Sequence, residues 1–283
     1  MTDQPITAAR PNPITDGTWQ SMKLFGYITV AILIAVGLAV WLGQWGWLDP
    51  SFVKSNGTTP KFLEQFINGL WRTLTLLIVS VVVGYALAVP IGLVQVTGPR
   101  PLAWLASGFC TFIRGTPLLV QLWLLYYGLG SLFPQVPWIR QSFLWDYLRD
   151  GFNYAMLAFI LSFAGYEGEI MRGAFLGVPK GELEAARAIG MSRFTVLRRI
   201  WLPRALMLVL PTLSGEVVSQ LKSTPLAATV TVFDIYGVGR MVQQDMFLTY
   251  EPLLLIAAIY GTLTAIIATA FKFVENLIPT RRG

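Results

Sequence analysis

The sequence predicts an all-α integral membrane protein. Of its 283 residues, 54% are hydrophobic and only 13% are charged, whereas about a quarter of the residues in a soluble domain are normally charged. Several uncharged runs also reach the roughly 20 apolar residues that a helix needs to cross a bilayer. These observations favour a multi-pass membrane protein over a soluble or nucleic-acid-binding one, although the formal net charge is +6. The chain has no His and one Cys, which removes histidine-based acid–base or metal chemistry and any internal disulfide.

The apolar runs predict six membrane spans. The first, residues 24–43, follows a polar tail of residues 1–23, and we expect it to be retained because no convincing signal-peptide cleavage site follows it. The other five are predicted at Thr73–Pro99, Gly115–Ile139, Gly151–Ile170, from Ala205 onward, and Pro252–Phe271. The run Pro101–Ile113 is too short to cross, so we expect an interfacial or buried cytoplasmic helix there.

The positions of Lys and Arg predict the orientation in the membrane. With the amino terminus inside, the inner side holds about twice as many of the 21 Lys and Arg residues as the outer side. Both termini, including a tail at residues 276–283, are then cytoplasmic. The basic segment 176–204 is cytoplasmic as well, where a soluble partner could reach it.

The fifth span contains residues that interrupt an ordinary transmembrane helix. Pro211 and Gly215 disfavour a regular helix, and Glu216 and Lys222 place charges inside an otherwise apolar run. We therefore predict a discontinuous helix, of the kind that exposes backbone dipoles near a transport path.

Charged residues inside the predicted spans are candidates for that path, because a charge buried in a bilayer costs about 3 kcal/mol. The candidates are Glu167, Glu169, Glu216 and Lys222. Glu167 and Glu169 lie about 200° apart around a helix, so only one of them can face a pore. We favour a structural role for Glu169 and leave Glu167 open. The alternative for Glu216 is an ion pair with Lys222 or with a partner subunit.

The segment after the fourth span predicts a helix, a sharp bend and a second helix. Pro179 and the two acidic residues in the following turn indicate a helix start, and we expect this helix over Lys180–Ile189. Gly190 can adopt the left-handed conformation that ends it, and Ser192 can cap the next helix. The segment is basic and amphipathic, which suits either docking of a soluble partner or contact with anionic lipid headgroups.

Arg114, Thr116 and Pro117 stand at the predicted start of the third span. Pro117 favours the first turn of a helix, Thr116 can cap that turn, and Arg114 can extend toward the membrane surface. The structural interpretation is a helix start. Whether Arg114 meets an ATPase, a lipid phosphate or a gate stays open.

The stretch Glu184–Pro203, EAARAIGMSRFTVLRRIWLP, resembles the EAA loop of the membrane subunits of ATP-binding-cassette (ABC) importers. The similarity is carried by Glu-Ala-Ala, by the following Gly and by the terminal Leu-Pro. It implies that the first helix sits in a cleft on a partner ATPase and carries its movement to the membrane helices. The residues to which it gives this role are Glu184, Ala185, Ala186, Gly190, Arg193, Leu202 and Pro203.

Three further motifs are similar to those of the polar amino acid permeases, the histidine and glutamine uptake group. They are FIRGTPLLVQ at residues 112–121, the combination of Glu169 with VPKG at 178–181, and EVVSQLKSTPL at 216–226. The resemblance implies the MetI-like transmembrane domain of a type I ABC importer over residues 62–275, with five core helices. Permeases for basic amino acids and opines are the nearest in pattern. The span at 24–43 is an extra helix outside this core.

This resemblance implies a permease subunit that passes a polar amino acid or related compound, with a basic one among the candidates, into a bacterial cell across the cytoplasmic membrane. The implied partners are two ATPase subunits that bind ATP and Mg²⁺, a second permease subunit, an external solute-binding protein and membrane lipids, but no nucleic acid. We expect no cofactor and no enzyme activity in this chain, because neither of its Lys-Ser pairs follows the glycines of a phosphate-binding loop.

Three other functions are weighed against this one. An ion-coupled secondary transporter would use Glu167, Glu216 and Lys222 as coupling groups, but it leaves the basic segment unexplained and predicts inverted repeats that are not evident. A membrane enzyme would need a nucleophile with an adjacent base, and this sequence offers no convincing pair of that kind. A passive scaffold or channel would retain no ATPase, whereas an importer would lose its ATPase when Glu184 or Gly190 is changed.

Overall fold

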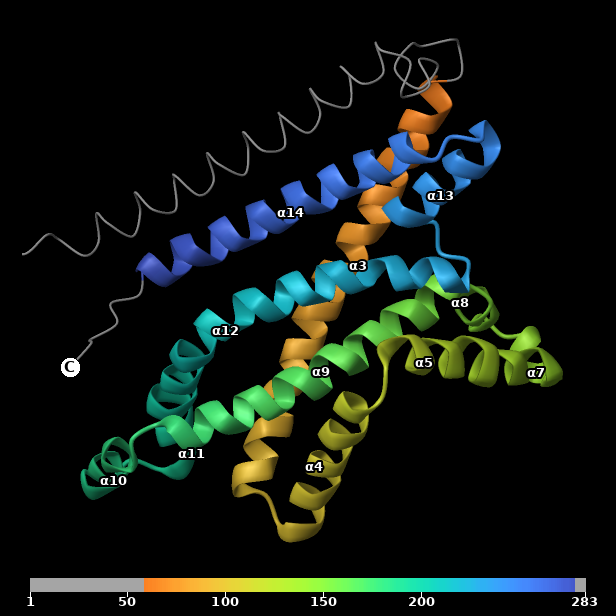
Figure 1. Cartoon of the computed structure of the whole chain (residues 1–283). Helices are drawn as coiled ribbons and strands as arrows, with labels where there is room; N and C mark the ends of the chain where they lie inside the picture. The colour runs from red at the N-terminus through yellow and green to blue at the C-terminus, as the bar shows by residue number, and fades with distance from the viewer. Residues whose placement is uncertain (1–58, 278–283) are drawn as a thin grey trace, which may run out of the picture.

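The computed structural model describes residues 59–277, and every regular element in this range is helical. Four long helices form its frame: α3 (Thr59–Thr97), α9 (Gly151–Gly177), α12 (Leu202–Ser223) and α14 (Tyr250–Leu277). Figure 1 shows α9, α12 and α14 side by side, with α3 crossing them. The shorter helices are α4 (Arg100–Gly115), α5 (Leu118–Trp123), α6 (Gly130–Leu132), α7 (Pro137–Arg140), α8 (Trp145–Leu148), α10 (Lys180–Ala188), α11 (Arg193–Val196) and α13 (Ile235–Met246).

The long helices alternate in direction. Helices α9 and α14 run toward the end of the molecule that carries α10 and α11, and α12 runs back from it (Figure 1). Helices α7, α8 and α13 lie at the opposite end. The connection between α9 and α12 therefore lies on the same side as the end of α14. The predicted span at residues 24–43 and most of the tail at 276–283 lie outside the described residues.

Close contact between α3 and α9 forms the centre of the bundle. A Cβ added at Gly92 of α3 would lie 2.7 Å from the Cβ of Met171 and 2.8 Å from the backbone nitrogen of Arg172. Small residues at such positions let two helix backbones approach closely. Helix α4 packs on the neighbouring face of α9, where a Cβ at Gly165 would overlap Ile113. The sequence therefore places glycine where the helices touch most closely.

Within residues 59–277, three helices are long and apolar enough to cross a membrane, namely Glu64–Thr97, Arg193–Val230 and Tyr250–Asn276. A fourth candidate is the bent pair described below. Helix α9 has 27 residues, which is long enough, but it is not among these three. It lies between α3, α4 and α12 and buries most of its surface against them, so it needs fewer lipid-facing side chains.

The prediction that the fifth span is broken at Pro211 and Gly215 is wrong. Helix α12 continues through both residues to Ser223. In membrane helices, neighbouring helices and local adjustments satisfy the backbone groups that a proline leaves free. The change of structure comes later: Thr224–Val230 is a 3₁₀ helix, which ends at Thr231 with a positive φ of 66°.

Helices α4 and α5 meet at an angle of 104°, so that residues 100–135 form either a broken span or a re-entrant loop. The predicted helix at Pro101–Ile113 is confirmed as α4. The predicted cap is not: Thr116 ends α4 and donates its hydroxyl hydrogen bond to the carbonyl of Phe112, and no side chain caps α5. Arg114 accordingly belongs to the last turn of α4, and Pro117 precedes α5.

Candidate coupling loop and intramembrane pocket

The segment after α9 forms a helical hairpin with the predicted shape. Helix α10 covers Lys180–Ala188, one residue shorter than expected. Gly190 has a φ of +82°, which is the left-handed turn that favours glycine. Ser192 then caps α11 by accepting a hydrogen bond from the backbone nitrogen of Thr195 at 3.3 Å. The helix, bend and helix predicted from the sequence are therefore confirmed.

The two faces of α10 differ in exposure. Leu183 and Ala186 are buried in an apolar cluster that also contains Phe175 and Val196. Glu184 and Ala185 lie on the exposed face, together with Arg187, Ala188 and Ile189, and Ile189 is 79% exposed. An exposed apolar residue beside charges on a projecting helix offers a contact surface for another protein. Of the Glu-Ala-Ala motif, only Ala186 faces the molecule itself.

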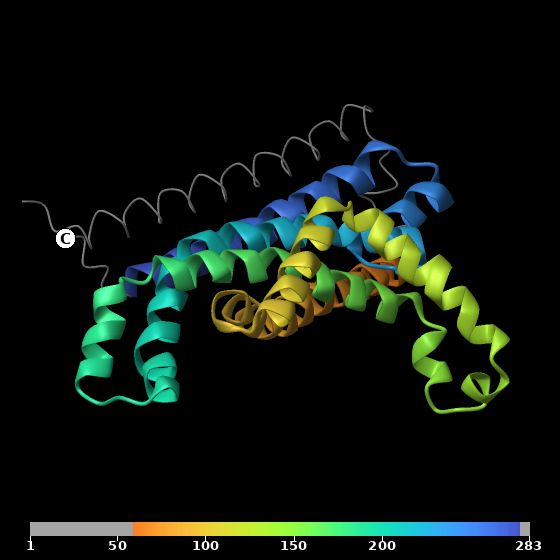
Figure 2. The same ribbon diagram turned by 90° about the horizontal axis from the view of Figure 1, so that it is seen from below.

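The second leg of the hairpin runs without interruption into α12. Leu197–Trp201 forms a π-helical turn, and Leu202 and Pro203 are the first two residues of α12. Arg193 is exposed at the start of α11. Figure 2 shows the hairpin projecting from one end of the molecule. The hairpin is thus joined directly to the fifth span.

A pocket of about 140 Å³ lies between α5, α9 and α12. Its polar lining comes from Thr116 before α5, Ser162 and Tyr166 of α9, and Glu216, Ser219, Gln220 and Ser223 of α12. The pocket therefore joins two motifs that are about 100 residues apart in the sequence. Its hydroxyl, amide and carboxylate groups suit a polar solute.

Arg114 lies near this pocket. Its guanidinium carbon is 5.8 Å from the ring centroid of Tyr166, and its charge interacts with Glu216. The turn that carries Arg114 and Thr116 is fixed by Gln121, which is buried. Its side-chain nitrogen donates to the carbonyl of Ile113 at 2.8 Å and to the hydroxyl of Thr116 at 2.8 Å. The bend between α4 and α5 thus shapes one wall of the pocket.

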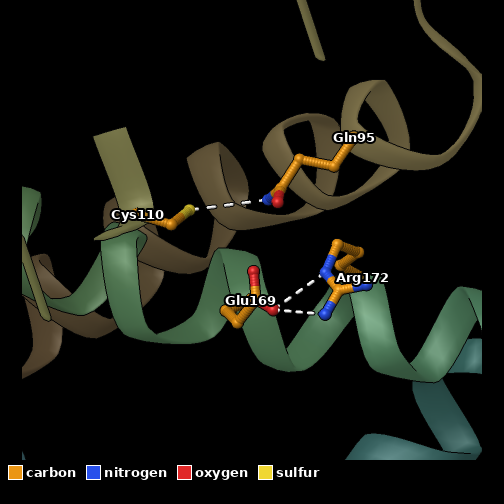
Figure 3. A network of polar contacts seen from close by, with 4 residues as sticks. All are labelled: Gln95, Cys110, Glu169 and Arg172. Carbon is orange, nitrogen blue, oxygen red and sulfur yellow. Dashed lines mark hydrogen bonds and ion pairs between the residues drawn. The ribbon is translucent and has the colours of Figure 1, made fainter. Parts of the chain in front are cut away.

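Glu167 and Glu169 have different surroundings. Glu167 is fully buried, and neither carboxylate oxygen has a hydrogen-bond partner among the described residues. Glu169 accepts a hydrogen bond from Nε of Arg172 at 2.8 Å within α9, as Figure 3 shows beside the contact between Gln95 and Cys110. The pair with Arg172 agrees with the structural role favoured for Glu169, and neither acid lines the pocket.

Lys222 is exposed on α12 and does not line the pocket. No ion pair joins it to Glu216 within residues 59–277, so the alternative of a pair inside this chain is not supported. The two residues lie six positions apart, about 120° around a helix, and therefore face different surroundings.

Sequence reasoning missed several pocket residues. Ser219 and Ser223 follow Glu216 by three and seven positions, which is the spacing of one helix face. That periodicity was readable from the sequence. The contribution of Ser162 and Tyr166 was not, because it depends on how α9 packs beside α12.

The chain matches known transport proteins over most of its length. The family model described as "Binding-protein-dependent transport system inner membrane component" matches residues 80–279. The octopine transport system permease protein OccM of Rhizobium radiobacter is 41% identical over 232 residues, which cover 79% of this chain and 92% of the relative. The histidine/lysine/arginine/ornithine transport system permease protein HisM of Escherichia coli K12 is 36% identical and covers 74% of this chain and 86% of HisM.

Solved structures show the same architecture. The crystal structure of an amino acid ABC transporter with histidines has a TM-score of 0.67 at 28% identity and covers 80% of this chain and 99% of the matched one. The MetNI methionine ABC transporter has a TM-score of 0.63 at 17% identity and covers 79% and 99%, which supports the fold alone. The predicted transmembrane fold of a type I ABC importer is confirmed, and the chain belongs to the family of binding-protein-dependent transport system inner membrane components.

Proposed function

We propose that this chain is the permease subunit of an ABC importer for a polar amino acid or a related compound, with cationic amino acids the leading class. The observation that carries the proposal is the hairpin of α10 and α11, which presents Glu184 and Ala185 outward and is joined directly to α12. A projecting helix with one buried and one free face is suited to receive movement from a partner. The names of similar permeases, which include lysine, arginine and ornithine, support the substrate class.

The pocket between α5, α9 and α12 is proposed to border the transport path. Glu216 supplies a carboxylate for a substrate ammonium or guanidinium group, and the hydroxyls of Ser219 and Ser223 supply further hydrogen bonds. Glu167, Glu169 and Lys222 lie outside this pocket and would border another part of the path. Arg114, Thr116 and Pro117 would form a gate beside it.

The proposed assembly contains two ATPase subunits, a second permease subunit and an external solute-binding protein, in the bacterial cytoplasmic membrane with both termini of this chain inside. ATP and Mg²⁺ would be bound by the ATPase, so this chain would catalyse no reaction itself. Each step of ATP binding and hydrolysis would shift the balance between inward-open and outward-open states by its difference in affinity for the two.

Uptake into vesicles tests the proposal. Vesicles that contain this chain with its partner ATPase, permease and binding protein are loaded with or without ATP, and labelled arginine, histidine, glutamine and glutamate are added in turn. We expect ATP-dependent accumulation of arginine or histidine. Equal accumulation driven by an ion gradient without ATP would instead support a secondary transporter. Glu184→Arg and Gly190→Asp should abolish uptake while membrane insertion is retained.

A further inference from the structure

An ion pair connects the coupling helix α10 to the first turn of α12. Nε of Arg204 donates to Oε2 of Glu182 at 2.9 Å, across 22 residues of sequence. The other two ion pairs of the described residues, Arg149–Asp146 and Arg172–Glu169, join residues three apart in the chain. Among residues 59–277, Glu182–Arg204 is therefore the ion pair that joins the hairpin to α12.

A second polar contact closes the hairpin onto α9. The indole nitrogen of Trp201 donates to the carbonyl of Phe175 at 2.9 Å, and the two rings meet edge to face with centroids 5.4 Å apart. Phe175 lies in the last turn of α9, where the backbone carbonyls have no partner within the helix. The base of the hairpin is thus fixed to α9 independently of the ion pair.

Helix α10 itself has little to hold it. It has nine residues, and its buried side chains are Leu183 and Ala186. Because these two side chains lie on one face of a short helix, a contact beside that face can help to set the rotation of α10 about its axis. Glu182 lies about 200° around the helix from Glu184, so the side that carries Glu182 reaches α12 while the side that carries Glu184 faces outward. The ion pair sits where it would resist this rotation.

We propose that Glu182 and Arg204 are positioning residues, which fix the orientation of α10 on α12 so that movement of a partner ATPase at Glu184 reaches the fifth span. The proposal rests on the proposed function. Both side chains are partly exposed, 34% for Glu182 and 55% for Arg204. Exposed ion pairs of this kind contribute little to folding stability. The loss of the Glu182–Arg204 pair should therefore change coupling and not the amount of folded protein.

Charge reversal in the complete importer complex tests this role. Glu182→Arg and Arg204→Glu are made singly and together, and uptake per ATP hydrolysed is measured in proteoliposomes. We expect each single reversal to lower this ratio by up to about fivefold while the complex retains its ATPase subunits, and the double variant to return within about twofold of wild type. The control is Asp146→Arg, which removes the exposed ion pair at the opposite end of the molecule and should leave the ratio unchanged.

A distance measurement separates positioning from transport. Spin labels are attached to cysteines introduced at Gly181 of α10 and Leu208 of α12, both exposed, in a Cys110→Ala background. The distribution of distances between the two labels should broaden in each single reversal, because α10 is no longer held in one orientation on α12. It should narrow again in the double variant.

Three outcomes overturn the inference: unchanged distances in the single variants, a double variant that transports as poorly as the single ones, or unchanged uptake despite a broadened distribution. If the wild-type complex itself shows no ATP-dependent uptake, the proposed function fails together with the coupling role, and that result is read from the wild-type sample alone.

Discussion

Replacement of Gly190 tests whether the left-handed turn determines the shape of the coupling hairpin. The series is Gly190→Asn, Gly190→Ala and Gly190→Val. At a φ of +82°, an ordinary L-residue is less stable by about 1–2 kcal/mol, Asn by less, and a β-branched residue by more. A Cβ at this position would meet nothing within 4 Å, so the whole effect comes from the backbone and not from a clash.

This penalty predicts a graded loss of ATPase binding. A difference of 1–2 kcal/mol lowers the population of the native turn by up to about 5–30-fold, and the apparent affinity of a partner that needs this turn falls by the same factor. When the solubilised permease is titrated with its ATPase, the wild type should therefore bind most tightly, followed by Gly190→Asn, Gly190→Ala and Gly190→Val in that order.

The matched control is Gly181→Ala, at an exposed position of α10 where an added Cβ also meets nothing within 4 Å but φ is not positive. It should bind like wild type. Wild-type affinity of the Val variant, or equal weakening by the control, would refute the reasoning.

Three other predictions concern the body of the protein. Gly92→Ala should lower the free energy of unfolding by up to about 2 kcal/mol in thermal unfolding, because overpacking against Met171 outweighs the gain in helix propensity; Gly261→Ala, with nothing within 4 Å, should not. Asp234 lies between the spans, and burial raises its pKa to about 6, above its unfolded value. The folded state then holds the proton more tightly, so the free energy of unfolding should fall by about 2 kcal/mol as the pH rises from 4 to 7, and a similar fall in Asp234→Asn would contradict this. Cys110, the one thiol in the chain, is 1% exposed and should resist maleimide until the protein unfolds; rapid labelling of the folded protein would show that α4 separates from α9.

The coupling hairpin could be predicted closely because its signals are local. Pro179, Gly190 and Ser192 each act through their own backbone or the next turn, so the ends of α10 and α11 follow from nearby residues. The long helices were also predictable from their apolar composition, although the sequence placed the start of α3 at Thr73 instead of Thr59. The preceding residues 59–72 include charged side chains, so the uncharged run alone did not show where that helix begins.

The errors arose where neighbouring helices decide the outcome. Pro211 disfavours a helix in isolation, yet α12 continues through it because the surrounding bundle supports the helix. Thr116 has the chemistry of a cap for either adjoining helix, and the sequence does not say that its hydroxyl turns back to Phe112. The contacts of Gln121 and of the Glu182–Arg204 pair join separate elements and become visible only in three dimensions.

The near contact of α3 and α9 at Gly92 also restricts how the permease can change shape. Two helices whose backbones touch cannot slide or rotate against each other without lifting apart, because the packed atoms leave no space to move into. Helices α3 and α9 should therefore travel as one rigid body during a transport cycle. The movement that opens the membrane to one side or the other must then occur at the borders of this body, where α12 and the bent pair α4–α5 pack against it.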